Sequence, residues 1–144
     1  MANICSTDYA FYSKNSEELK EFHRILQNAV NDVQSGRVPS ESGEADYEVL
    51  QLAIGISRLE LVPGRGYICS MDDDVQNDEE GEFFIVQMCD MWRASPDIFR
   101  KMLHDFPDIQ FVYQEIEPGN GIAETNDRNG RFFRDDGENH LTIV

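Results

Sequence analysis

The stretch that decides the fold is FFIVQMCDMW, residues 83–92. Side chains of an extended chain point alternately to its two faces, and here both faces are apolar. Phe84, Val86 and Met88 share one face, and Phe83, Ile85 and Cys89 share the other. A strand without a polar face is typical of the interior of a sheet. Residues 83–92 are therefore predicted to form a central strand.

The segments that precede this strand are short. Pro63-Gly64-Arg65-Gly66 is predicted to be a turn, because glycine and proline dominate such connections. Residues 67–71 then read as a short strand. The acidic run 72–82 reads as a solvated hairpin loop between the two strands.

A helix and a strand are predicted after residue 92. Ser95-Pro96-Asp97 offers a capping hydroxyl, a proline in the first turn and a carboxylate near the positive end of the helix dipole. Pro107 ends this helix. Residues 109–114 then alternate between apolar and polar side chains, as in a half-buried strand.

The N-terminal part predicts a strand followed by a long helix. Residues 4–12 are rich in β-forming side chains and alternate in part. Residues 16–35 carry apolar side chains three and four positions apart, which makes one stripe along a helix. Asn15 and Glu18 form a capping pattern at its start, and Gly36 stands where a left-handed C-terminal cap is expected.

Two further segments add to this order. After a polar loop at 37–46, residues 47–56 read as a short helix, with a strand as the alternative for so short an apolar run. Near the C-terminus, residues 122–125 and 131–134 are predicted to pair as a small terminal hairpin around the turn signal Asn129-Gly130.

The order is therefore strand, helix, strand, strand, helix, strand, which is the split βαβ arrangement. It predicts an α+β, ferredoxin-like sandwich in one domain over residues 1–144. Four antiparallel strands would carry two helices on one face, with a short inserted helix and a C-terminal hairpin added. The first and third strands are central in that arrangement, which agrees with the apolar character of residues 83–92.

Charge is the most unusual property of the chain. Its 144 residues include 28 Asp and Glu against 12 Lys and Arg, a formal net charge of −16. Such a surface repels nucleic-acid phosphates and anionic membranes, because binding to both depends on basic side chains. Basic protein partners would be attracted, with faster encounter at low salt. Solubility alone is the alternative explanation of the acidity.

The cysteines and the apolar runs predict a cytoplasmic protein. Cys5, Cys69 and Cys89 are an odd number without paired spacing, so we expect three reduced thiols and neither a disulfide framework nor a zinc site. No apolar run approaches the roughly 20 residues that cross a bilayer. The N-terminus shows no basic start and no apolar core, so no export signal is expected.

Several short motifs together resemble a known family. They are Met1-Ala2-Asn3-Ile4-Cys5-Ser6, Arg65-Gly66-Tyr67-Ile68, Trp92, Glu117-Pro118-Gly119, Thr125-Asn126-Asp127 and Gly130-Arg131-Phe132-Phe133. With these the chain resembles the ferredoxin-like domain family of YubB-type plasmid proteins and related phage and gut-bacterial proteins. Many members begin Asn-Trp-Cys, from which Ile4 departs. The resemblance implies the fold and a mobile-element association, and it implies no activity and no cofactor.

The acidic run and the neighbouring tryptophan are the first candidate site. We expect a basic protein partner to bind a surface made of Asp72, Asp73, Asp74, Asp78, Glu79, Glu80 and Trp92. One version is a nucleic-acid mimic, in which carboxylates at phosphate-like spacing occupy a basic groove of the partner. A calcium-binding EF-hand loop does not fit, because Asn77 and Phe83 stand where glycine and glutamate are required. No metal, cofactor or catalytic residue is predicted.

The alternative is a small-ligand or enzyme site near Trp92. Glu115 and Glu117 lie two apart on a predicted strand, so they point the same way, and Tyr67 is the aromatic candidate beside them. A carboxylate pair can perform acid–base chemistry if burial separates the two pKa values. The simpler interpretation is that both residues frame the Pro118 turn at the end of an edge strand.

Overall fold

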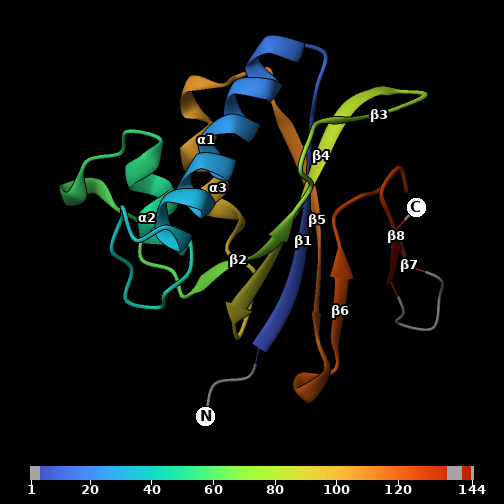
Figure 1. Cartoon of the computed structure of the whole chain (residues 1–144). Coiled ribbons are helices and arrows are strands. Elements are labelled where there is room, and N and C mark those ends of the chain that lie inside the picture. Colours follow the sequence, from blue (N-terminus) through green and yellow to red (C-terminus); the bar gives the residue numbers. More distant parts are fainter. Residues whose placement is uncertain (1–3, 136–140, 144) are drawn as a thin grey trace.

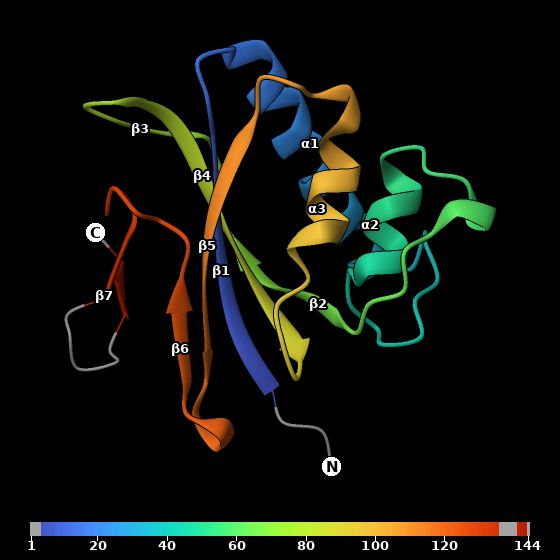
Figure 2. The same cartoon turned by 180° about the vertical axis from the view of Figure 1, so that it is seen from behind.

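Three helices cover one face of an antiparallel sheet, and a C-terminal hairpin lies against the other face (Figure 1, Figure 2). The computed structural model describes residues 4–135 and 141–143. The predicted α+β class is confirmed. No helix in this described part of the chain is long and apolar enough to cross a membrane.

The main sheet has six strands rather than the four that were predicted. They are β1 (Ile4–Ser13), β2 (Gly66–Met71), β3 (Gln76–Asp78), β4 (Gly81–Met91), β5 (Gln110–Glu117) and β6 (Ile122–Thr125). The order is β2-β4-β1-β5-β6, and β3 pairs with β4 beyond the end of β2. β4 lies between β2 and β1 and pairs with β1 from Ile4↔Met91 to Ser13↔Glu82, so its predicted central position is confirmed.

The helices form where the apolar stripes predicted them. α1 (Ser16–Gln34) is capped by Asn15, whose side chain accepts a hydrogen bond from the Glu18 amide, and Gly36 follows the helix with a φ of 79°. α2 (Tyr47–Ala53) confirms the short inserted helix, and Asp46 caps it. α3 (Pro96–Met102) continues into the 3₁₀ turn Leu103–Asp105.

The predicted hydroxyl cap of α3 is wrong. Within the described chain the Ser95 side chain makes no capping hydrogen bond. Its backbone is instead held from the sheet, because the Ser95 amide donates to the Tyr9 hydroxyl at 3.2 Å. A tertiary contact therefore fixes the start of this helix where a local cap was expected.

Aromatic rings fill the core between the sheet and the helices. Tyr9 and Phe11 from β1 contact Phe99 of α3 at ring-centroid distances of 4.5 and 5.2 Å. Phe11 also contacts Phe22 of α1 at 5.1 Å and Phe84 of β4 at 5.3 Å. All five side chains are fully buried, which joins both helices to the two central strands.

Glycine is required where the chain passes over this core. A Cβ atom at Gly66 would lie 2.3 Å from Asp90 Oδ1 and 2.8 Å from the Tyr47 ring. At Gly64 it would lie 2.4 Å from the side chain of Ile98. The structure shows no turn at residues 63–66, which lead directly into β2, and the glycines are required there by close backbone approach.

A smaller apolar cluster covers part of the opposite face of the sheet. Phe132 and Phe133 pack there against Ala10, with Tyr12, Phe83, Ile85 and Val112 around them. The guanidinium of Arg131 lies 4.6 Å from the Phe132 ring centroid and 5.2 Å from that of Tyr12. This cluster explains the second apolar face of β4.

The predicted pairing of residues 122–125 with 131–134 is wrong. β6 joins the main sheet beside β5, with Gln114↔Thr125 to Glu117↔Ile122 as its register. The C-terminal hairpin consists instead of β7 (Phe133–Asp135) and β8 (Leu141–Ile143). Because β6 covers β5 over residues 114–117, Glu115 and Glu117 do not lie on an edge strand.

The expectation of three reduced thiols is also wrong. Cys69 and Cys89 form a disulfide across the β2–β4 pair, with their Cα atoms 6.0 Å apart. The register of this pair shifts between Ile68 and Ser70, and Cys69 lies at this irregularity without a Cα partner of its own in β4. Sequence spacing does not reveal such an irregularity. Cys5 is buried and free. The cytoplasmic location stays a prediction, and the disulfide removes one of its grounds.

Candidate functional site

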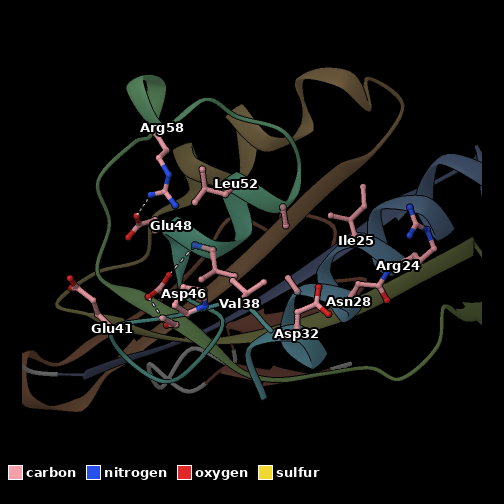
Figure 3. A pocket seen from close by; sticks show the side chains of 15 residues that line it. Arg24, Ile25, Asn28, Asp32, Val38, Glu41, Asp46, Glu48, Leu52 and Arg58 are labelled. Carbon is pink, nitrogen blue, oxygen red and sulfur yellow. Dashed lines mark hydrogen bonds and ion pairs between the residues drawn. The ribbon is translucent and has the colours of Figure 1, made fainter. Parts of the chain in front are cut away.

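An open groove lies between α1, α2 and the loop at 37–46 (Figure 3). Its volume is about 730 Å³. Grooves of this size accommodate several side chains of a bound molecule. α1, α2 and the loop that border the groove lie on the opposite side of the sheet from the C-terminal hairpin (Figure 1).

The groove has an apolar lining. Ile25 of α1, Leu52 of α2 and Val38 of the connecting loop line it (Figure 3). Ala29 and Val49 lie deeper and are buried. Ile25, Val38 and Leu52 remain partly exposed, so part of this lining faces water.

Charged side chains form the rim of the groove. Its lining includes four carboxylates, from Asp32, Glu41, Asp46 and Glu48, and two guanidinium groups, from Arg24 and Arg58. Both guanidinium groups are already paired. Arg24 contacts Glu21 at 2.5 Å, and Arg58 contacts Glu48 at 3.2 Å. Negative charge therefore predominates around the apolar lining.

The wall that α2 provides is held firmly in place. Gln51 is fully buried, and its amide donates to the carbonyls of Tyr47 and Val62 at 3.2 and 2.9 Å. The Val62 amide donates back to Gln51 Oε1 at 2.9 Å. Asp46 Oδ1 accepts from the Val49 amide at 3.0 Å and fixes the first turn. The groove is consequently formed before anything binds.

The predicted acidic surface is only partly available for binding. Asp72 Oδ2 accepts from the Ile85 amide at 2.9 Å, and its carbonyl lies 2.8 Å from His23 Nε2. Asp78 and Glu80 contact Arg131 at 2.8 and 3.1 Å. These three residues stabilise the β3–β4 hairpin.

The remaining acidic residues of the predicted binding surface are exposed. They are Asp73, Asp74 and Glu79. The β3–β4 hairpin that follows Asp73 and Asp74 extends beyond the rest of the sheet, as both views show (Figure 1, Figure 2). The hairpin therefore presents fewer carboxylates than the sequence suggested.

Trp92 lies in a tight turn at the end of β4. Among the residues that the structure describes it is the one non-glycine residue with a positive φ, at 75°. The Arg93 amide donates to the Met91 carbonyl at 3.0 Å, which makes Trp92 the centre of a strained γ-turn. The indole is 48% exposed. Sequence reasoning selected Trp92 but had no signal for this conformation.

The buried carboxylate of Glu115 holds that turn. It accepts from Arg93 Nε at 3.0 Å and from the Ala94 amide at 2.8 Å. Glu124 contacts the same guanidinium at 3.2 Å from the surface. Glu115 is 3% exposed, so its carboxylate is occupied by the protein itself.

The structure does not bring Tyr67 together with Glu115 and Glu117. Tyr67 pairs with Cys89, and its neighbours Gly66 and Ile68 are the β2 residues that face the core. Glu115 pairs with the buried Thr7 on the helical face of the sheet. Tyr67 therefore points to the opposite face from the two glutamates. Glu117 is buried, and its Oε1 accepts from the Gly119 amide at 3.0 Å.

A buried polar network lies beside the same end of the sheet. The Tyr47 hydroxyl donates to Asp90 Oδ1 at 2.5 Å, and Asp90 Oδ2 has no hydrogen-bond partner within the described chain. Burial raises the pKa of Asp90 to about 6, against the lowering effect of the Tyr47 hydrogen bond. Burial also raises the pKa of the Cys5 thiol to about 11, which keeps it protonated and unreactive at neutral pH.

No group of three or more His, Cys, Asp or Glu side chains within residues 4–135 and 141–143 is placed to hold a metal ion.

Comparison of the chain with family models, with curated proteins and with solved structures found no match. The resemblance to the YubB-type family therefore stays a prediction.

The groove was missed by sequence reasoning, although a signal for it exists. Ile25 lies outside the buried face of α1, and Leu52 lies outside the buried face of α2. An apolar residue left over beside a complete stripe indicates a second surface to cover.

Proposed function

We propose that this protein is a non-enzymatic binding module that engages a basic protein partner. The observation that carries the proposal is a surplus of exposed carboxylates that the protein does not neutralise itself. There are 28 acidic residues against 12 basic ones. Six arginines already contact carboxylates of the same chain: Arg24, Arg37, Arg58, Arg93, Arg100 and Arg131.

This charge distribution favours binding of positively charged surfaces. An excess of one sign raises the rate of encounter with the opposite sign and suppresses like-charged partners. The carboxylates around the groove and those on the β3–β4 hairpin supply the attraction, while the groove supplies apolar contact area. Charge would thus set the encounter rate and the groove would set the specificity.

We further propose that four of the strands form a ferredoxin-like core. Their order β2-β4-β1-β5 supports this, since the first and third strands of the split βαβ unit lie in its centre. α1 and α3 occupy the two helix positions of that unit, with α2 and β6 as additions. The fold by itself implies no activity, so the functional proposal depends on the charge and the groove.

The test is affinity capture from a lysate of the source organism. Immobilised protein is washed at about 50 mM and then at about 500 mM salt, since screening weakens contacts between exposed charges. We expect basic proteins to be retained at low salt and released at high salt. An unrelated acidic protein of similar net charge is the control, because it reveals proteins that bind any polyanion.

Retention of proteins without a basic bias, or retention of nothing beyond the control, would contradict the proposal. The narrower version, mimicry of nucleic acid, makes an additional prediction. The captured protein would itself bind DNA or RNA, and this acidic chain would compete for the same surface.

A further inference from the structure

We infer that the groove between α1 and α2 is the docking site for a basic amphipathic helix of the partner. The inference rests on the proposed function and adds to it the place of contact and the chemistry of the segment that binds. It follows from the apolar lining, the helical walls and the charge of the rim.

The lining selects an apolar face. Ile25 and Leu52 line the groove together with Val38, and all three are partly exposed (Figure 3). Two or three apolar side chains of a partner fit a volume of about 730 Å³. Their burial would remove both surfaces from water, which is the main favourable contribution to such an interface.

The walls favour a helix over an extended strand. α1 and α2 border the groove and present side chains to it, and no strand in the described part of the chain contributes to its lining. A peptide that binds by strand addition pairs its amides and carbonyls with a sheet edge, and none of the described residues that line the groove belongs to a strand. A helix needs only a surface of ridges and grooves, which two neighbouring helices provide.

The rim selects basic residues on the flanks of that helix. Glu41 is exposed at the rim, and Asp32 and Glu48 also border the groove. Arg24 and Arg58 pair with Glu21 and Glu48, and Arg37 of the adjoining loop pairs with Asp32. Glu41 and Asp46 are then the lining carboxylates for which the described chain shows no arginine partner. A lysine- or arginine-bearing helix would meet net negative charge here, and an acidic one would be repelled.

The probe for the test is a fluorescein-labelled synthetic helix of about 18 residues, made only of leucine and lysine, with leucine at the i, i+3, i+4 and i+7 positions. A scrambled peptide of the same composition keeps the charge but has no apolar face. Oligolysine of the same length has the charge alone. Binding is measured by fluorescence anisotropy at low and high salt.

Two variants block the groove in different ways. Leu52→Asp places a charge among the apolar side chains, and Asn28→Trp fills the groove from an exposed position on α1. Each has a matched control outside the groove. Leu59→Asp is the control for Leu52→Asp and changes a side chain that is 97% exposed. Asn31→Trp is the control for Asn28→Trp and changes an exposed residue of α1 outside the groove. Circular dichroism and thermal unfolding verify that all four variants are folded.

The expected result is about tenfold or more weaker binding of the amphipathic peptide for Leu52→Asp and Asn28→Trp, and less than about a twofold change for both controls. The scrambled peptide and oligolysine should bind the wild type more weakly. Equal binding of the amphipathic and scrambled peptides, or unchanged binding by folded Asn28→Trp, would overturn the groove assignment.

The same measurement separates the two proposals. If all three peptides bind equally and salt abolishes their binding, charge-driven association stands and the groove assignment fails. If the amphipathic peptide binds through the groove regardless of salt, the groove assignment stands and the charge-driven function fails.

Discussion

At the level of single residues, Asp90 lies in surroundings that are unfavourable for a charge. It is 1% exposed, and burial raises its pKa from 3.8 to about 6. A pKa raised in the folded state means that folding favours the protonated carboxyl. The contribution of the protonated Asp90 carboxyl to the free energy of unfolding is fully present below the ordinary pKa. It is lost as the pH rises through about 6.

Replacement of this carboxylate should therefore favour the folded state at high pH. The unfolding free energy of Asp90→Asn minus that of the wild type should rise by about 1–3 kcal/mol from about pH 4 to pH 8. Urea unfolding at both pH values measures this change. Asp73→Asn removes an exposed carboxylate and should show a change of less than about 0.5 kcal/mol. An identical pH dependence for Asp90→Asn and the wild type would refute the assignment.

Trp92 gives a second test at this scale, because its φ of 75° favours glycine. The variant Trp92→Gly should be more stable than Trp92→Ala by about 1 kcal/mol, since only alanine keeps the strained backbone. At exposed Asn31 within α1 the order should reverse, with alanine the more stable. Urea unfolding of the four variants decides this, and a more stable alanine at position 92 would contradict the γ-turn.

At the level of elements, Glu115 connects the end of β4 and the start of α3 to β5. Glu115→Gln should lower the unfolding free energy by about 2 kcal/mol, because it removes the charge of a buried carboxylate that accepts hydrogen bonds from Arg93 and the Ala94 amide. Glu124→Gln removes the exposed carboxylate that contacts the same Arg93 and should cost less than about 0.5 kcal/mol. Chemical unfolding compares the two variants, and equal losses would show that Glu115 does not hold this connection.

The β2–β4 pair gives a covalent test. Unfolded without reductant, the protein should expose one reactive thiol per chain, that of Cys5. After reduction it should expose all three of its cysteines. A thiol-reactive dye read by mass spectrometry counts them. Three thiols before reduction would show that Cys69 and Cys89 are not joined.

Local pattern was sufficient for most elements. The two apolar faces of residues 83–92 predicted an interior strand, and the spacing in α1 together with Asn15 and Gly36 predicted that helix. Pairing between distant segments was not predictable. β6 pairs with β5, and Cys69 reaches Cys89, through registers set by the packing of the whole sheet.

The candidate site was predicted less well than the fold. Asp72, Asp78 and Glu80 were expected to be free for binding. In the structure Asp72 accepts from the Ile85 amide, and Asp78 and Glu80 pair with Arg131, which lies far along the chain. The groove lies where α1 packs beside α2, and the sequence of neither helix alone predicts this packing. Ile25 and Leu52 acquire significance only once both helices are placed.

At the level of the whole molecule, the helical layer presents an apolar groove in a strongly acidic surface. The central claim is that a basic amphipathic helix binds across this groove. The negative charge would accelerate the encounter with the partner. The hydrogen bonds of Gln51 that hold α2 in place would keep the groove formed before the partner binds.

The most direct test is amide NMR of the labelled protein during titration with the leucine–lysine helix. We predict that the largest shifts occur at Ile25, Asn28, Ala29, Val49 and Leu52, and that they disappear in Asn28→Trp. Shifts confined to residues 72–80 or to the turn at Trp92, with none in α1 or α2, would contradict the account.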